Sequence, residues 1–378
     1  MNTEIRPLGE ILGEIDDPRN PKGKRHPLGA ILSLCVVAMM AGAKTPKAIA
    51  NWWKNRIGLG SFLERLGFTK EYGPSKSTLY LVLSMITVEQ IEAKISQWIE
   101  ENWGYLPQPG QDELEGIALD GKVLRGSRKQ GASQTHLLGA LSHRLGFIVS
   151  QLGIDDKTNE IGAMPDFLAG LVIEGRVFTM DALLTQRDIA QTVVDGGGDY
   201  VMIVKENQPR LYADIHELFA EPGAEPFVAD EATTTNKGHG RLEQRRLRTS
   251  LDLADFSDWP GLQQAFILER KAIILTTGEI RQQTVYGITS LSAQRADAMR
   301  LITITRGHWG IENRAHWVRD VTFGEDLSQV RKGNLPQMMA ALRNCVINLF
   351  RRHYIRYIPD GFDFFAARPF DALDAIGC

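Results

Sequence analysis

The sequence predicts an α/β protein in which a mixed sheet is flanked by helices, with an all-helical region before it and a β-rich insertion within it. Two observations support this fold class. From residue 1 to about 105, apolar side chains recur at helical spacing. From residue 116, short apolar runs typical of strands follow one another and then alternate with helical segments, which is the order expected of a mixed sheet covered by helices.

The N-terminal region is expected to form a separate helical domain. Four helices are predicted in it, at 28–42, at 46–57, after an N-cap at Ser75, and at 88–102. Proline and glycine in the stretch 103–110 then indicate a linker. We therefore expect one domain at 1–105 and a second at 112–378.

The second domain begins with the strands of the sheet. Strands are predicted at 117–120, 136–142, 147–154, 176–181 and 200–204, with helices at 161–171 and 186–194. Residues 206 to about 290 depart from this order, because a helix at 208–219 precedes β-rich sequence at 243–288. We interpret this stretch as an insertion. Helices at 292–320 and 335–353 follow it.

The composition is that of an ordinary globular protein, with 43% hydrophobic and 24% charged residues among 378. A net charge of −3 disfavours a chain that simply coats nucleic acid, but it allows local basic patches. The three cysteines follow no zinc or disulfide spacing. The longest apolar run, Ile31 to Ala43, is too short to span a bilayer and is expected to be a buried helix. With no signal-peptide pattern at Met1, we expect a cytoplasmic protein.

The most informative stretch runs from His308 to Trp317. As a helix it places His308, Glu312 and His316 on one face. A carboxylate between two imidazoles is consistent with a metal site, and also with structural ion pairs. Taken alone, the three side chains allow a zinc hydrolase, although their spacing is not that of the HExxH motif.

Two aspartates can act together with Glu312. Asp120 and Asp181 each end an apolar run that is predicted to be a strand, and Gly121 leaves room for a ligand beside Asp120. Three clustered carboxylates repel one another, and a divalent cation removes that cost. Oxygen ligands without cysteine favour Mg²⁺ or Mn²⁺. Each residue alone has a plainer explanation as a turn cap or a solvated charge, so the prediction depends on their order and placement together.

Longer motifs around these residues resemble the insertion-sequence transposases of the DDE superfamily, specifically the H-repeat-associated (ISAs-type) group, over nearly the whole chain. The matching segments are Asp17-Pro18-Arg19 with His26-Pro27-Leu28, Ala118-Leu119-Asp120-Gly121-Lys122, Asp181-Ala182 with Lys205-Glu206-Asn207-Gln208, His239-Gly240-Arg241 with Glu243 and Arg245, and Arg306 to Asp326. Two positions depart from the wider superfamily. His308 stands where relatives carry an arginine, and Arg319 stands where they carry a lysine.

The resemblance implies an RNase H-like catalytic core. It also implies two divalent ions, Mg²⁺ or Mn²⁺, held by the catalytic residues Asp120, Asp181 and Glu312. The reaction implied is cleavage of DNA strands at transposon ends and transfer of the 3′-OH into target DNA. No covalent enzyme intermediate is expected.

The same resemblance implies double-stranded DNA as the partner, both as terminal inverted repeats and as target, with a homodimer or higher oligomer formed on DNA, no membrane, and a nucleoid-associated location in the cytoplasm. DNA contacts are expected from Lys122, Lys205, Arg241, Arg245, Arg306, His308 and Arg319. Residues 1–105 are a further candidate for binding DNA ends, although basic helical domains are as often packing or dimerisation modules.

Three other functions remain open at this stage. A DNA-binding remnant would keep the fold without cutting, although the three carboxylates are intact. An RNase H-like nuclease or resolvase would share the cleavage chemistry and lack strand transfer. A zinc hydrolase built on His308, Glu312 and His316 would leave Asp120 and Asp181 without a role.

Overall fold

The computed structural model describes residues 6–55, 60–103, 114–128, 134–154, 158–220 and 228–378. Its N-terminal helices are α1 (Leu8–Gly13), α2 (Leu28–Met40), α3 (Pro46–Lys54), α4 (Gly60–Arg65), α5 (Lys76–Met85) and α6 (Val88–Trp103). Ser75 caps α5 by accepting a hydrogen bond from the Thr78 backbone N–H, as predicted. The predicted linker at 103–110 lies almost entirely outside the described residues.

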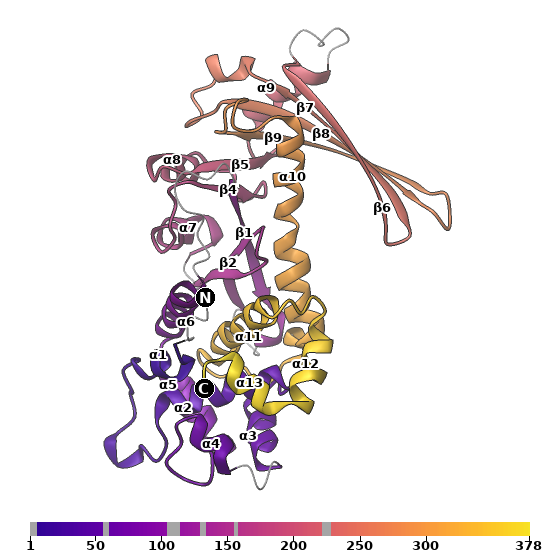
Figure 1. Cartoon of the computed structure of the whole chain (residues 1–378). Helices are drawn as coiled ribbons and strands as arrows, with labels where there is room; N and C mark the ends of the chain where they lie inside the picture. The colour runs from indigo at the N-terminus through magenta and orange to yellow at the C-terminus, as the bar shows by residue number, and fades with distance from the viewer. Residues whose placement is uncertain (1–5, 56–59, 104–113, 129–133, 155–157, 221–227) are drawn as a thin grey trace.

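The apolar stretch predicted to be a buried helix forms α2, and every one of its side chains is buried. Around α2 pack α1 and α3 from the N-terminal region and three helices from the far end of the chain. Those three are α11 (Leu335–Arg352), α12 (Ile358–Ala367) and α13 (Pro369–Ala375). The first and last parts of the chain therefore share one hydrophobic core. In Figure 1 the indigo and yellow helices lie next to each other.

The described strands form a single nine-stranded sheet in the order β3-β2-β1-β4-β5-β9-β8-β7-β6. The first five are β1 (Glu115–Leu124), β2 (Thr135–Ser142), β3 (Ile148–Ile154), β4 (Arg176–Met180) and β5 (Asp199–Val204). β1, β4 and β5 run parallel, whereas β2 and β3 are antiparallel to their neighbours. The mixed sheet predicted from the sequence is therefore confirmed.

The strand predicted at 117–120 extends further than expected. β1 continues through Gly121 and Lys122 to Leu124, because β2 pairs with it as far as Thr135 opposite Leu124. Asp120 therefore lies within a strand and not at its end. On its other side β1 pairs with β4 only as far as Leu119 and Met180, so Asp120 has no partner residue on β4.

The β-rich segment after β5 continues the same sheet. It contains helix α9 (Pro209–Ala220) and strands β6 (Asp230–Gly238), β7 (Arg241–Ser250), β8 (Gln264–Ile274) and β9 (Ile280–Thr289), and β9 pairs with β5. The far halves of these four strands project from the body as a long antiparallel arm (Figure 1). β6 was not predicted, because its polar and threonine residues carry little apolar alternation.

Helices cover both sides of the sheet. α7 (Glu160–Ala169) and α8 (Arg187–Asp195) lie on one side, and α10 (Ala298–His308) lies against β1 and β4 on the other (Figure 1). The helix predicted at 292–320 is not uniform, since Glu312–His316 and Val318–Thr322 form π-helical turns after α10. Within the described part of the chain, no helix combines the length and apolar character that a membrane crossing requires.

Candidate active site

Parallel pairing of β1 with β4 brings two aspartates to one place. Leu119 pairs with Met180, and the next residue on each strand is Asp120 or Asp181. Asp181 lies just past the end of β4, where its Oδ1 accepts a hydrogen bond of 3.2 Å from the Leu184 backbone N–H. The parallel pairing of β1 with β4 therefore accounts for the two aspartates lining one cavity.

The π-helical turn after α10 adds two further side chains. Nδ1 of His316 lies 3.3 Å from Oε2 of Glu312 and 3.4 Å from Oδ2 of Asp120. One ligand atom from each of Asp120, Glu312 and His316 lies within 4.8 Å of the other two. A π turn has hydrogen bonds between residues i and i+5, one residue wider than in an α-helix. The position of His316 is therefore shifted from the one it would have in an ideal α-helix. The three polar atoms face one small volume.

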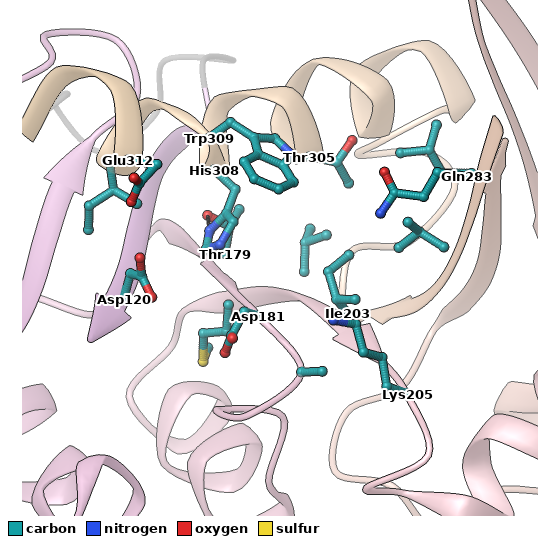
Figure 2. Close-up of a pocket in the computed structure, with 16 residues that line it drawn as sticks. Asp120, Thr179, Asp181, Ile203, Lys205, Gln283, Thr305, His308, Trp309 and Glu312 are labelled. Carbon is teal, nitrogen blue, oxygen red and sulfur yellow. Dashed lines mark hydrogen bonds between the residues drawn. The ribbon is translucent and has the colours of Figure 1, made fainter. Parts of the chain in front are cut away.

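Asp120 and Glu312, but not His316, line a cavity of about 470 Å³ between the sheet and α10. Asp120, Asp181, Glu312 and His308 all contribute to its wall, and Figure 2 shows Asp120 and Glu312 facing each other with Asp181 on the opposite side of the opening. The cavity continues past Thr305 and Gln283 toward Lys205, at the end of β5. It is wide enough to admit a polar ligand beside the carboxylates.

Crowding of negative charge is visible in the pKa values. Burial, and then the charge of Asp181, raise the pKa of Asp120 to about 7. Glu312 differs, because its contact with His316 lowers its pKa. Burial lowers the pKa of His316, which favours the neutral imidazole that can donate a lone pair. Two carboxylates and a neutral imidazole that lie this close together are a donor set suited to a divalent cation.

The grouping differs from the predicted one. Asp120 and Glu312 belong to it, but its third member is His316, which the sequence suggested as a ligand only in the zinc alternative. Asp181 lies in the same cavity but outside the 4.8 Å group. The imidazole adds a nitrogen to the oxygen donors that the sequence predicted.

His308 is held by a different set of contacts. Its Nδ1 lies 3.0 Å from Oγ1 of Thr179, and the same hydroxyl lies 3.1 Å from Nε2 of His143. Since one hydroxyl carries one proton, it donates to one ring and accepts from the other. His308 therefore presents its remaining nitrogen toward the cavity and does not join Glu312 and His316 as a ligand. The zinc triad considered from the sequence is not assembled.

Two of the predicted DNA contacts are internal. Lys122 is buried, with its Nζ 2.6 Å from Oδ1 of Asp320. Arg319 is buried as well and binds Glu325 at 2.9 Å and Gln151 at 2.8 Å. Both cations are themselves buried and paired within the protein, which disfavours direct contact with DNA. The sequence could not reveal these two ion pairs, because Asp320 and Glu325 belong to a segment that was predicted as an ordinary helix and loop.

The remaining predicted cations are near the cavity or beyond it. Lys205 and Arg306 are exposed, Lys205 at the cavity wall and Arg306 along α10. Arg241 and Arg245 lie on the arm, beside a second hollow that is described below. Thr179, which orients His308, was missed by the sequence reasoning, because a threonine inside a buried strand carries no visible signal.

Comparison with known proteins identifies the family. The model of the transposase DDE domain matches residues 111–349, and that of the DDE_Tnp_1-associated region matches residues 10–99. The chain belongs to the DDE transposase family. Among similar proteins, the "H repeat-associated putative transposase YhhI" of Escherichia coli (strain K12) is 31% identical over 357 residues, covering 92% of this chain and 90% of that protein. The family makes this chain a DNA transposase of the H-repeat-associated type.

Two more distant or shorter matches complete the comparison. The "H repeat-associated putative transposase YbfD" of Escherichia coli (strain K12) is 31% identical over 256 residues, covering 67% of this transposase and 96% of that protein. Among solved structures, a piggyBac transposase synaptic complex with hairpin DNA matches with a TM-score of 0.43 and 9% identity, covering 97% of this chain and 77% of that one. At that level of similarity no conclusion about fold or function follows.

Proposed function

We propose that this transposase cleaves DNA strands at transposon ends and transfers the resulting 3′-OH into target DNA, with divalent cations bound at the cavity between the sheet and α10. The observation that supports this most is the convergence of Asp120, Glu312 and His316, with Asp181 across the same cavity, in a chain of the DDE family. Nothing comparable is needed by a protein that only binds DNA.

We infer an RNase H-like core from the order of the first five strands. The order β3-β2-β1-β4-β5, with an acid on β1, another just after β4 and a third from a helix that crosses the sheet, is consistent with that architecture. In this proposal residues 112–378 form the catalytic domain and residues 206–290 its β-rich insertion. Residues 1–105 are then a helical transposase-associated domain, with DNA-end binding as one role for it.

Asp120, Glu312 and His316 would hold one divalent ion, and Asp181 would hold a second together with Asp120. Bound there, two ions of Mg²⁺ or Mn²⁺ would neutralise charge on the scissile phosphate and lower the pKa of the attacking hydroxyl. Burial, and then the charge of Asp181, raise the pKa of Asp120, and bound cations would offset both by stabilising its ionised form. Asp120 would be central, because the charges of Asp181 and of Glu312 both act on it.

The protein's own side chains would align the phosphodiester. In-line attack requires mainly fixed geometry and positive surroundings. His308, oriented by Thr179, directs a ring nitrogen into the cavity from the α10 side, where it can contact a phosphate oxygen. Lys205 stands at the far wall with an exposed ammonium group, suited to the backbone of the bound strand. Ile203, Val285 and Leu268 make the rest of that wall apolar.

The partner would be double-stranded DNA, first the terminal inverted repeats and then the target. Two ends must be joined to one target, so we propose a homodimer or higher oligomer assembled on DNA. A decisive experiment combines the purified protein with labelled DNA carrying the inverted repeats that flank its gene, Mg²⁺ or Mn²⁺, and a supercoiled target plasmid. Cleaved ends joined to the plasmid support the proposal. Cleavage without joining identifies a nuclease or resolvase, and no cleavage with either ion identifies a DNA-binding remnant.

A further inference from the structure

A second hollow of about 820 Å³ lies between the arm and α10, next to the candidate active site. Basic side chains reach it from both walls, whereas the only acid that lines it is Glu243. The cations are Lys237, Arg241, Arg245, Arg270, Arg306 and Arg314. We call this hollow the arm groove. For a protein with a net charge of −3, its positive character is a local feature that requires an explanation.

Strand geometry places these arginines on one face of the arm. Alternate residues of β7 share a face, so Arg241, Glu243 and Arg245 all point into the groove. On the neighbouring strand β8, Arg270 pairs directly with Arg245 and therefore points the same way. The outer face of the same strands carries Arg246, which is bound by Glu231 at 2.7 Å. The arginines that face the groove (inner) and those that face away from it (outer) therefore lie on the same strands and differ only in what surrounds them.

Glu243 holds the inner arginines in place. Its carboxylate lies 2.8 Å from Arg245 and 3.7 Å from Arg241, and it also binds Arg270. Burial alone would raise the pKa of Glu243, but the surrounding arginines outweigh it and keep the pKa below its usual value. One buried carboxylate among three guanidinium groups leaves two positive charges without a partner in the cluster. Such a set is arranged for an anion.

One guanidinium has an unused donor. Only 11% of the Arg245 side chain is exposed, and its Nη1 is buried without a hydrogen-bond partner among the described residues. A buried donor left unpaired is costly, so native structures rarely keep one unless a ligand or water completes it. Across the groove from Arg245, the exposed Arg306 on α10 adds a further positive charge. The unused donor therefore marks where an anionic oxygen would bind.

The arm groove joins the catalytic cavity. Both are lined by Leu268, Gln283, Val285, Thr305 and Trp309, so one hollow opens into the other along α10. A polymer with one phosphate at the carboxylates would therefore extend into the groove. Trp309 stands at this junction and is 56% exposed.

We propose that the arm groove is a phosphodiester clamp that binds the DNA strand leaving the active site, with Arg245 and Arg270 on a backbone phosphate and Glu243 as the positioning residue that pre-orients them. This inference rests on the proposed function for the identity of the polymer. It gives the motif of His239-Gly240-Arg241 with Glu243 and Arg245 a specific role, because the turn at the tip and the alternating charged residues build one face of the clamp.

The test measures DNA binding separately from cleavage. A fluorescein-labelled duplex ending in the flanking inverted repeat is titrated with the full-length protein in Ca²⁺ at several salt concentrations, and fluorescence anisotropy is recorded. Arg245→Gln and Arg270→Gln should each weaken binding roughly tenfold and reduce the salt dependence by about one counterion. Arg246→Gln and Lys271→Gln, the next residues on the outer face, should leave both quantities unchanged. Equal effects from inner and outer variants would overturn the clamp.

Glu243→Gln separates positioning from simple charge. It makes the groove more positive, so a purely electrostatic role predicts tighter DNA binding. A positioning role predicts weaker binding, by roughly threefold to tenfold, and this is the result we expect. Tighter binding would overturn the role of Glu243, and thermal unfolding of each variant shows that it is folded. Cleavage in Mg²⁺ is scored separately, so a wild-type protein that binds through the groove but never cuts would refute the proposed function and leave the clamp intact.

Discussion

Nδ1 of His316 lies 3.4 Å from Oδ2 of Asp120, which joins the π-helical turn to the central strand β1. The contact is between a buried imidazole and a carboxylate that also faces Glu312. It makes His316 a member of the candidate metal site, which the sequence suggested only in the zinc alternative.

Replacement of His316 should weaken metal binding. If its imidazole is a ligand, His316→Ala should lower Mn²⁺ affinity roughly tenfold or more, measured by electron paramagnetic resonance of free Mn²⁺. The wild-type spectrum should also show coupling of bound Mn²⁺ to nitrogen, and the variant should lose it. His353→Ala is the matched control, because this exposed histidine directly follows the last residue of α11 and does not line the cavity. Unchanged affinity together with absent nitrogen coupling would remove His316 from the site.

The metal-free protein should lose stability as pH rises. Burial and the charge of Asp181 raise the pKa of Asp120 to about 7, whereas an unfolded aspartate ionises near pH 4. Between these values the folded state retains a proton that the unfolded state has released, so the folded state becomes relatively less stable with increasing pH. Asp120→Asn removes this cost. In EDTA at pH 8 it should raise the free energy of unfolding by on the order of 1–3 kcal/mol.

The same variant should lose most of this advantage near pH 4, where the folded wild-type protein keeps the Asp120 proton and the unfolded chain is only about half ionised at that residue. Urea unfolding at the two pH values gives the comparison directly. A variant that is no more stable than the wild type at pH 8 would show that Asp120 carries no such electrostatic cost.

A buried cluster of charged side chains lies next to the π-helical turns that follow α10. Glu325 binds Arg319 at 2.9 Å and Arg343 at 2.6 Å, and all three side chains are buried. Glu325→Gln would leave two guanidinium groups in the interior without a counter-charge, so it should cost about 3 kcal/mol in urea unfolding. Glu279→Gln, which breaks the exposed pair with Arg281, should leave stability unchanged. Equal effects of the two substitutions would contradict a structural role for the cluster.

Gly307 leaves space for the ring of His143, which shares a hydrogen bond with the hydroxyl of Thr179. A Cβ at Gly307 would overlap the ring of His143, as would one at Gly116 on the other side of that ring. Gly307→Ala should therefore destabilise the protein by about 1–3 kcal/mol and displace the hydrogen bond to His308. At Gly310, in the next turn, the nearest atom to an added Cβ is 3.4 Å away. Gly310→Ala should be neutral or slightly stabilising in thermal unfolding, and a loss there equal to that at Gly307 would refute this explanation.

The sequence was sufficient for the parts of the site that depend on strand order. Asp120 and Asp181 follow apolar runs, and neighbouring parallel strands bring such residues together. It was insufficient where one residue's partner is set by local backbone geometry. Nothing in residues 308–322 predicts π turns, and these turns move His316 beside Asp120. The same turns lie beside the buried pairs of Lys122 with Asp320 and of Arg319 with Glu325.

The arm shows a second limit. Alternation of apolar and polar residues predicts strands that bury one face, and it indicated a β-rich stretch at 243–288, which contains most of β7, β8 and β9. β6 has no buried face, so its threonines and charges gave no signal. The packing of α11, α12 and α13 against α2 was equally hidden, because contacts between the two ends of a chain leave no pattern in either end alone.

The central claim is tested most directly by comparing carboxylate variants in Mn²⁺-dependent nicking of a labelled transposon end. Asp120→Asn, Asp181→Asn and Glu312→Gln should each reduce the nicking rate at least ~100-fold while DNA binding in Ca²⁺ is preserved. Asp166→Asn is the matched control, because this acid is exposed on α7 and does not line the cavity; its rate should stay within about tenfold of the wild type. Nicking by Asp120→Asn at the wild-type rate, or its loss in Asp166→Asn alone, would contradict the account.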